Sequence, residues 1–114
     1  MIARMTTYEG GEPSHAEEVL AWVQRTMVPA MRGQPGFDRA VTLLDREGGR
    51  AIEISFWESE AAMQNAVSEM EHIADDMPDI GQHRADVRLL EVGLNEANSP
   101  ESPIPAAIPH RTLA

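Results

Sequence analysis

Residues 50–67, RAIEISFWESEAAMQNAV, contain a strand signal that passes directly into a helix signal. Up to Trp57 the side chains alternate between two faces, a period typical of a β-strand. One face carries Ile52, Ile54 and Phe56, and the other carries Glu53, Ser55 and Trp57. Ser59 is placed to cap a helix, and Glu60 puts a negative charge in its first turn. The apolar residues from Ala62 to Met77 recur at helical spacing, so we expect a helix from about Ser59 to between His72 and Met77.

The remaining elements are predicted as partners of this unit. Strands are expected over residues 2–8, 37–45 and 85–93, and Gly48-Gly49 predicts a hairpin before Arg50. A first helix is expected after a capping box at Ser14–Glu17, with Pro29 loosening its last turn. The order β-α-β-β-α-β predicts a ferredoxin-like α+β subunit with an antiparallel sheet. We assign it to residues 1–94 and interpret the proline-rich residues 95–114 as a flexible C-terminal tail.

Large apolar side chains occur on both faces of the predicted strand at 50–57. In a ferredoxin-like subunit the helices cover one face of the sheet only. A sheet that is apolar on both faces needs a second cover, which a second subunit can supply. We therefore expect a homodimer.

Composition excludes several classes of partner. The formal net charge is −10 and there is no cysteine. An acidic chain without a basic stripe argues against nucleic acid or an anionic membrane as a partner. No apolar run approaches the ~20 residues that span a bilayer, and the N-terminus lacks the apolar region of a signal peptide. We expect a cytoplasmic protein.

Several short motifs together resemble the antibiotic biosynthesis monooxygenase superfamily. They are Pro35-Gly36-Phe37, the Gly48-Gly49 hairpin, the run from Phe56 to Met63 (FWESEAAM), and Glu91-Val92 in the final strand. The resemblance covers roughly residues 1–94. It implies a homodimer whose two sheets face each other in a dimeric α/β barrel, and a ligand pocket between sheet and helices in each subunit.

The resemblance also implies a chemistry. Well-understood members oxygenate polycyclic aromatic compounds without metal or flavin, by forming an electron-rich substrate anion that reacts with O2. In those members a Trp, an Asn and a Tyr are implicated. The Trp corresponds to Trp57, whereas Glu53 and Met63 stand at the Asn and Tyr positions. A carboxylate half-buried beside an indole can act as a base, so we assign Trp57 and Glu53 as candidate catalytic residues.

A haem-degrading branch of the superfamily resembles the chain less. It implies a Trp and a His at positions that hold Ala66 and Asp76 here. We therefore expect neither haem nor another cofactor, and we find no metal-ligand spacing.

Further candidates for lining the pocket are Met63, Met70, Arg4, Tyr8 and His72. Each has a plainer interpretation: the methionines and Trp57 as core, Arg4 and Tyr8 as surface residues, His72 as solvent-facing, and Glu53 as the partner of Arg4 or Arg88. The leading function is a cofactor-independent monooxygenase that acts on an electron-rich aromatic or quinone-like small molecule. The alternative is a non-catalytic dimeric small-molecule-binding or stress-response protein on the same fold.

Overall fold

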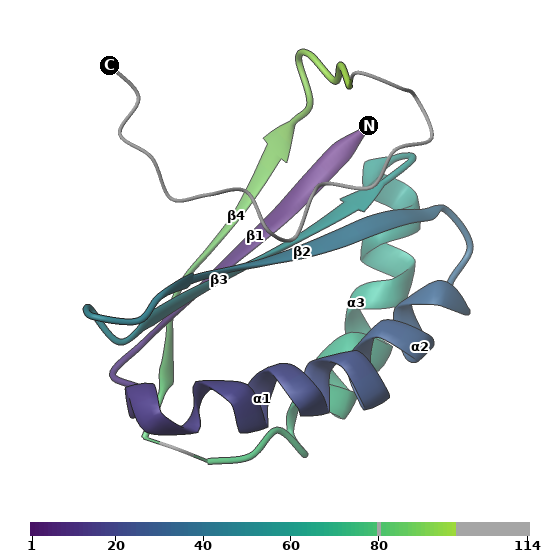
Figure 1. Ribbon diagram of the computed structural model, residues 1–114. Helices are drawn as coiled ribbons and strands as arrows, with labels where there is room; N and C mark the ends of the chain where they lie inside the picture. Colours follow the sequence, from purple (N-terminus) through teal and green to yellow (C-terminus); the bar gives the residue numbers. More distant parts are fainter. Residues whose placement is uncertain (80, 98–114) are drawn as a thin grey trace, which may run out of the picture.

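The chain folds into two layers, a four-stranded sheet and a layer of helices that covers one of its faces (Figure 1). The structure, a computed structural model, describes residues 1–79 and 81–97. Most of the predicted tail at 95–114 therefore lies outside the described residues. The elements in chain order are β1 (Ile2–Glu9), η1 (Pro13–His15), α1 (Ala16–Trp22), η2 (Val23–Met27), α2 (Val28–Arg32), β2 (Phe37–Asp45), β3 (Arg50–Trp57), α3 (Glu60–Ala74) and β4 (His83–Glu91).

The sheet has the strand order β2-β3-β1-β4, and each neighbouring pair is antiparallel. This arrangement confirms the predicted ferredoxin-like α+β fold. The predicted strand at 37–45 and the strand that ends at Trp57 have the expected bounds. The last strand begins at His83 rather than Ala85, and a bulge between Thr7 and Tyr8 shifts its register against β1.

Ser59 caps α3 as expected, because its Oγ accepts a hydrogen bond from the Ala62 amide at 3.1 Å. The capping box predicted at Ser14–Glu17 is wrong. A 3₁₀ turn occupies Pro13–His15 instead, and no side chain caps the start of α1. The residue before α1 is already held by a backbone bond from the His15 amide to the Glu12 carbonyl at 2.9 Å.

The first helical region runs on from α1 through η2 to α2, and η2 is a π-helical turn. Pro29 follows that turn in α2. A proline inside a helix lacks the amide proton for the i−4 carbonyl, and its ring collides with that carbonyl, here that of Arg25. The wider π turn, in which the Val28 amide bonds to the Val23 carbonyl, makes room for it. The loosening expected from Pro29 thus falls in the preceding turn.

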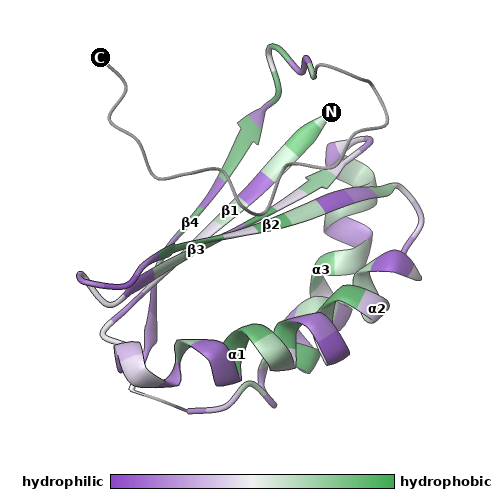
Figure 2. Ribbon diagram, viewed as in Figure 1, coloured by the Kyte–Doolittle hydropathy of each residue, from purple (hydrophilic) through white to green (hydrophobic). Residues whose placement is uncertain are grey.

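The two faces of the sheet differ in polarity. Residues directly opposite in an antiparallel pair share a face, and Thr6 lies opposite Glu53 while Arg4 lies opposite Ser55. This polar set faces the helices, whose apolar sides are turned toward the sheet (Figure 2). By alternation Ile52, Ile54 and Phe56 point to the opposite, open face, which none of the helices in the described residues covers (Figure 1).

Two buried clusters hold the helices against the sheet. One consists of Val23, Met27, Met31 and Met70, and the other of Trp57, Met63 and Ala66. The turn before β2 comes close to α3 at Gly36, which has φ +83°. A Cβ added there would lie 2.5 Å from the Ala62 Cβ, so this position of the Pro-Gly-Phe motif requires glycine.

Helices long and apolar enough for a bilayer crossing do not occur in the described part of the chain.

Candidate functional site

A cavity lies between the sheet and the helices, and we call it the inner cavity. It encloses about 100 Å³ and widens toward solvent into a hollow of about 760 Å³. The enclosed part is smaller than the about 300–1,000 Å³ of common small-molecule sites, so a ligand of that size would extend into the open hollow. Its lining includes Arg4, Thr6, Tyr8, Val23, Met27, Met31, Thr42, Glu53, Ser55, Trp57, Met63, Met70, Glu71 and Arg84.

Glu53 supplies a carboxyl group to the wall of this cavity, on the polar face of β3. Burial raises the pKa of the Glu53 carboxyl above its ordinary value, and the positive charge of Arg4 opposes this only in part. The pairing of Glu53 with Arg4 or Arg88 is not what the structure shows. Arg4 bonds to Glu71 and Arg88 to Asp86. A carboxylate that is desolvated rather than neutralised is suited to accept a proton from a ligand.

Tyr8 lies on the same wall, diagonally across the β1–β3 pair from Glu53. Burial, followed by the negative charge of Glu53, raises the pKa of the Tyr8 phenol to about 12. The phenol therefore keeps its proton at neutral pH and can donate a hydrogen bond to an oxygen of a ligand.

Arg4, Glu71 and Arg84 form a charged cluster at one side of the cavity. Glu71 accepts from Arg4 at 2.7 Å and from Arg84 at 2.6 Å and 2.8 Å, and Arg4 also donates to the Thr6 hydroxyl at 3.3 Å. Glu71 and Arg84 escaped the sequence analysis. The contact between them depends on the bulge that places Arg84 opposite Tyr8, and no local sequence pattern predicts that bulge.

Trp57 closes the end of the cavity away from Tyr8 and is only 2% exposed. Its indole N–H donates to the Ser55 hydroxyl at 2.9 Å, and its ring meets Phe37 edge to face at 5.4 Å. Met63 and Met70 are also buried, and both line the cavity. The structure thus brings together Arg4, Tyr8, Glu53, Trp57, Met63 and Met70, whereas His72 lies exposed on α3 and outside the lining.

The raised pKa of Glu53 gives a testable dependence of stability on pH. Between its unfolded and its higher folded pKa, the folded chain holds a proton that the unfolded chain has released. The free energy of unfolding therefore falls as pH rises through this range, and the loss persists above it. Glu53→Gln removes the loss, so we expect the variant to melt above the wild type at pH 7–8. The difference should vanish well below pH 4.5.

Thermal unfolding followed by circular dichroism across this pH range measures the effect. Glu58→Gln makes the same chemical change at an exposed position and should change little at any pH. A Glu53→Gln variant that is less stable than the wild type at neutral pH would show that the carboxylate is stabilised by the fold.

Solved structures with the same fold are distant in sequence. SnoaB, a cofactor-independent oxygenase from Streptomyces nogalater, is 19% identical; the match covers 82% of this chain and 94% of that one with a TM-score of 0.58. A monooxygenase from the ActVA-Orf6 gene of Streptomyces coelicolor, solved with nanaomycin D, is 15% identical, with coverages of 86% and 92% and a TM-score of 0.65. At these identities the likeness shows the fold alone.

A third structure corrects one expectation. The haem degrader MhuD from Mycobacterium tuberculosis holds two haems in its active site; it is 19% identical, with coverages of 85% and 100% and a TM-score of 0.65. The expectation of no cofactor, with haem disfavoured, is therefore wrong for this fold. In the inner cavity the iron ligands that the described residues could offer are methionine thioethers and the Tyr8 phenol, while the cations of the lining, Arg4 and Arg84, are both bonded to Glu71. When bound, haem would supply redox chemistry at its iron.

Among the described residues, no group of His, Cys, Asp and Glu side chains could hold a metal ion. No curated protein matches the chain at a significant level. A family model does match, over residues 1–74, and it is described as antibiotic biosynthesis monooxygenase. That match covers the sheet strands β1 to β3, the first helical region and α3. The chain therefore belongs to the antibiotic biosynthesis monooxygenase family.

Proposed function

We propose that this protein is an oxygenase that acts on an electron-rich aromatic or quinone-like small molecule bound in the inner cavity. The observation that carries the proposal is Glu53, a carboxyl group with a raised pKa that lines the inner cavity and forms no ion pair with any of the described residues. Glu53 is the proton acceptor in this proposal, Tyr8 the hydrogen-bond donor, and Trp57 the aromatic wall against which rings pack.

The reaction needs no reductant other than the substrate. Glu53 removes a proton from an acidic carbon or phenol, and the resulting anion transfers one electron to O2. The two radicals join in a carbon–oxygen bond, the peroxide takes up a proton, and loss of water leaves a carbonyl. A CH2 group and O2 thereby become C=O and H2O. The buried wall around Glu53 and Trp57 excludes water while the anion exists.

We propose further that two copies of the chain pair through the open face of the sheet. The helix-facing side is polar around the cavity, whereas the open side carries Ile52, Ile54 and Phe56. Leu43 on β2 and Leu90 on β4 are 49% and 46% exposed in the single chain. A second copy would bury this surface, as the family resemblance implies. The cytoplasm stays the predicted location.

A non-catalytic dimeric small-molecule-binding or stress-response protein is the second candidate. The burial of Trp57, Met63 and Met70 favours it, because these side chains reduce the enclosed space to about 100 Å³. A binding protein needs only enough space to hold a small ligand, whereas an oxygenase must also admit O2 and let the substrate change shape.

Oxygen consumption distinguishes the two candidates. We expect purified wild-type protein to consume one O2 per quinone formed from each of a set of anthrones, measured with an oxygen electrode and by mass spectrometry. Parallel reactions with added haemin show whether turnover requires it. Binding of these compounds, detected by tryptophan fluorescence, without any oxygen uptake would overturn the oxygenase proposal in favour of the binding protein.

A further inference from the structure

A second hollow lies beside the inner cavity, between α1 and the β2–β3 hairpin, and we call it the outer pocket. It encloses about 60 Å³ within an open hollow of about 610 Å³. The two spaces share the wall formed by Tyr8, Val23, Thr42 and Glu53. The candidate proton acceptor therefore stands at the junction between them.

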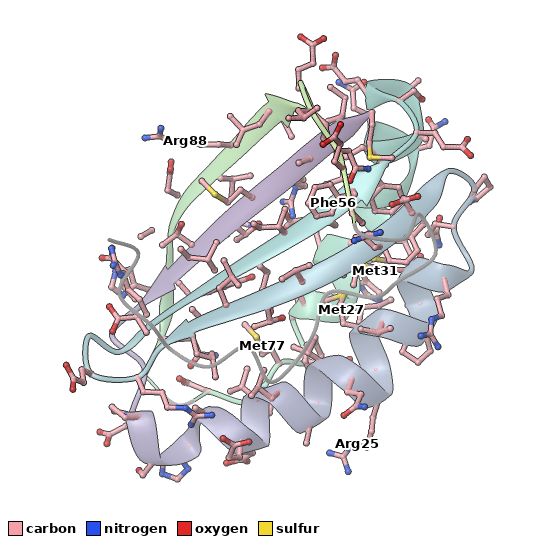
Figure 3. All side chains as sticks on the ribbon, turned by 45° about the horizontal axis from the view of Figure 1, so that its top comes forward. Arg25, Met27, Met31, Phe56, Met77 and Arg88 are labelled. Carbon is pink, nitrogen blue, oxygen red and sulfur yellow. The ribbon has the colours of Figure 1, made fainter. Side chains whose placement is uncertain are left out.

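The walls of the outer pocket are mostly apolar. Ala16, Val19, Leu20, Leu44, Ala51 and Met77 line it. Figure 3 shows Met77 in the space between the sheet and the first helical region, with Met27 and Met31 farther along the same space. Met27 and Met31 belong to the inner cavity, so the two spaces follow one another along the helices.

The pocket exists because the apolar face of the first helical region, from Ala16 to Met31, does not contact the sheet along its whole length. Val23, Met27 and Met31 are buried against the sheet, but Ala16, Val19 and Leu20, one or two turns earlier, are only half-buried. Their apolar surface faces the outer pocket instead of packing on a strand. An apolar group that enters the hollow removes the exposed surface of these side chains from water, which makes its binding favourable.

Two ion pairs lie at the rim of the outer pocket. Arg46, in the hairpin, forms an ion pair with Glu17 on α1, and Arg50 pairs with Asp45 across the hairpin. These contacts join the two sides of the mouth and place charged groups at its edge. Beyond the rim the polar side chains of the lining are few, namely Glu53, Tyr8, Thr42 and Gln82.

We propose that the outer pocket binds an unbranched alkyl substituent of the substrate. The ligand is then amphiphilic, with its aromatic head in the inner cavity at Glu53 and its chain along α1 toward the rim. This inference rests on the proposed function for the identity of the head group. Glu53 to Arg50 spans roughly 10 Å of strand, which accommodates a chain of roughly six carbons.

Binding of a series of hydroquinones that carry no chain, propyl, hexyl or decyl groups tests the inference. Titration calorimetry under nitrogen measures affinity without turnover. We expect affinity to rise about three- to fourfold per methylene up to roughly six carbons and then to level off. Ala16→Phe fills the pocket and should abolish the gain while leaving the affinity for plain hydroquinone unchanged.

Ala21→Phe is the matched control, because Ala21 is an exposed residue of the same helix and should keep the wild-type chain-length dependence. Val19→Thr, of nearly equal volume, is a second variant that should weaken the gain without filling the space. Equal affinities across the series, or an undiminished gain in both pocket variants, would overturn the inference.

The two proposals fail separately in these measurements. Chain-length-dependent binding without oxygen uptake leaves the alkyl site standing and rejects the oxygenase. Oxygen uptake with an anthrone, together with hydroquinone affinities that do not depend on the chain, supports the oxygenase and rejects the alkyl site.

Discussion

Glu53→Gln is expected to lower turnover of an anthrone by about 10²–10⁴-fold, the usual effect of removing a general base. Glutamine keeps the size of the side chain but cannot accept the substrate proton. The affinity for the substrate should change little, since rings and apolar groups supply most of the contact in the inner cavity. Steady-state oxygen uptake measures kcat, and titration of a non-reacting analogue measures affinity.

The wild-type rate should also rise with pH as the Glu53 carboxyl ionises, and it should level off above the raised pKa. This pH step should be missing in Glu53→Gln. Glu58→Gln, at an exposed site just beyond β3, is the control and should keep both rate and pH profile. Full activity of Glu53→Gln in an enzyme that turns over would make Glu53 a structural carboxylate and place the base elsewhere.

Glu53→Gln is expected to gain stability at neutral pH while it loses activity. Both effects have one cause. Burial of the ionised Glu53 carboxylate lowers the free energy of unfolding, and the same burial makes the carboxylate a better acceptor for the substrate proton. A residue retained only for structure would show the opposite coupling. The pair of measurements therefore tests function more sharply than either one alone.

The fold could be predicted from the sequence because its signals are local. Alternation ending at Trp57 and the cap at Ser59 fix the bounds of β3 and α3. The Gly48-Gly49 turn pairs β2 with β3, and Gly49 takes φ +65° there. Predictions failed where contacts outside the local sequence pattern set the structure. The start of α1 follows a 3₁₀ turn instead of a capping box, and a bulge shifts the register of β4.

The candidate site could be predicted only in part. Alternation puts Glu53 and Trp57 on one face of their strand, and the cavity contains both. Nothing local indicates that Arg4 would turn to Glu71 rather than to Glu53, since that choice depends on how α3 lies across β1 and β4. The outer pocket was also missed, because the stripe from Ala16 to Met31 is uniform in sequence while only its C-terminal part reaches the sheet.

Polarity of the sheet links the site to the assembly. A strand that turns Glu53 and Ser55 toward the helices must turn Ile52, Ile54 and Phe56 the other way, and Phe56 lies on that outward side in Figure 3. The polar sheet wall of the inner cavity and the apolar open face of the sheet are thus two consequences of the same alternation along the strand.

Ile54→Asp is accordingly expected to convert a dimer at micromolar concentration into a monomer or to unfold it. A dimer built on the open face would bury an unpaired carboxylate from each subunit, at a cost of several kcal/mol each. At about 1.4 kcal/mol per tenfold, the dissociation constant should rise about 10³-fold or more. Light scattering gives the mass, and circular dichroism shows whether the monomer is folded.

Leu43→Asp keeps the test informative if Ile54→Asp does not fold. Leu43 is 49% exposed in the single chain, so a charge there costs the subunit little and the dimer much. Ala61→Asp, on the exposed side of α3, is the control and should remain dimeric. A wild type that is monomeric, or an Ile54→Asp protein that stays dimeric, would contradict pairing through this face. A folded Leu43→Asp monomer with weakened oxygenation would tie the assembly to the inner cavity, since the same strands form the open face and one wall of that cavity.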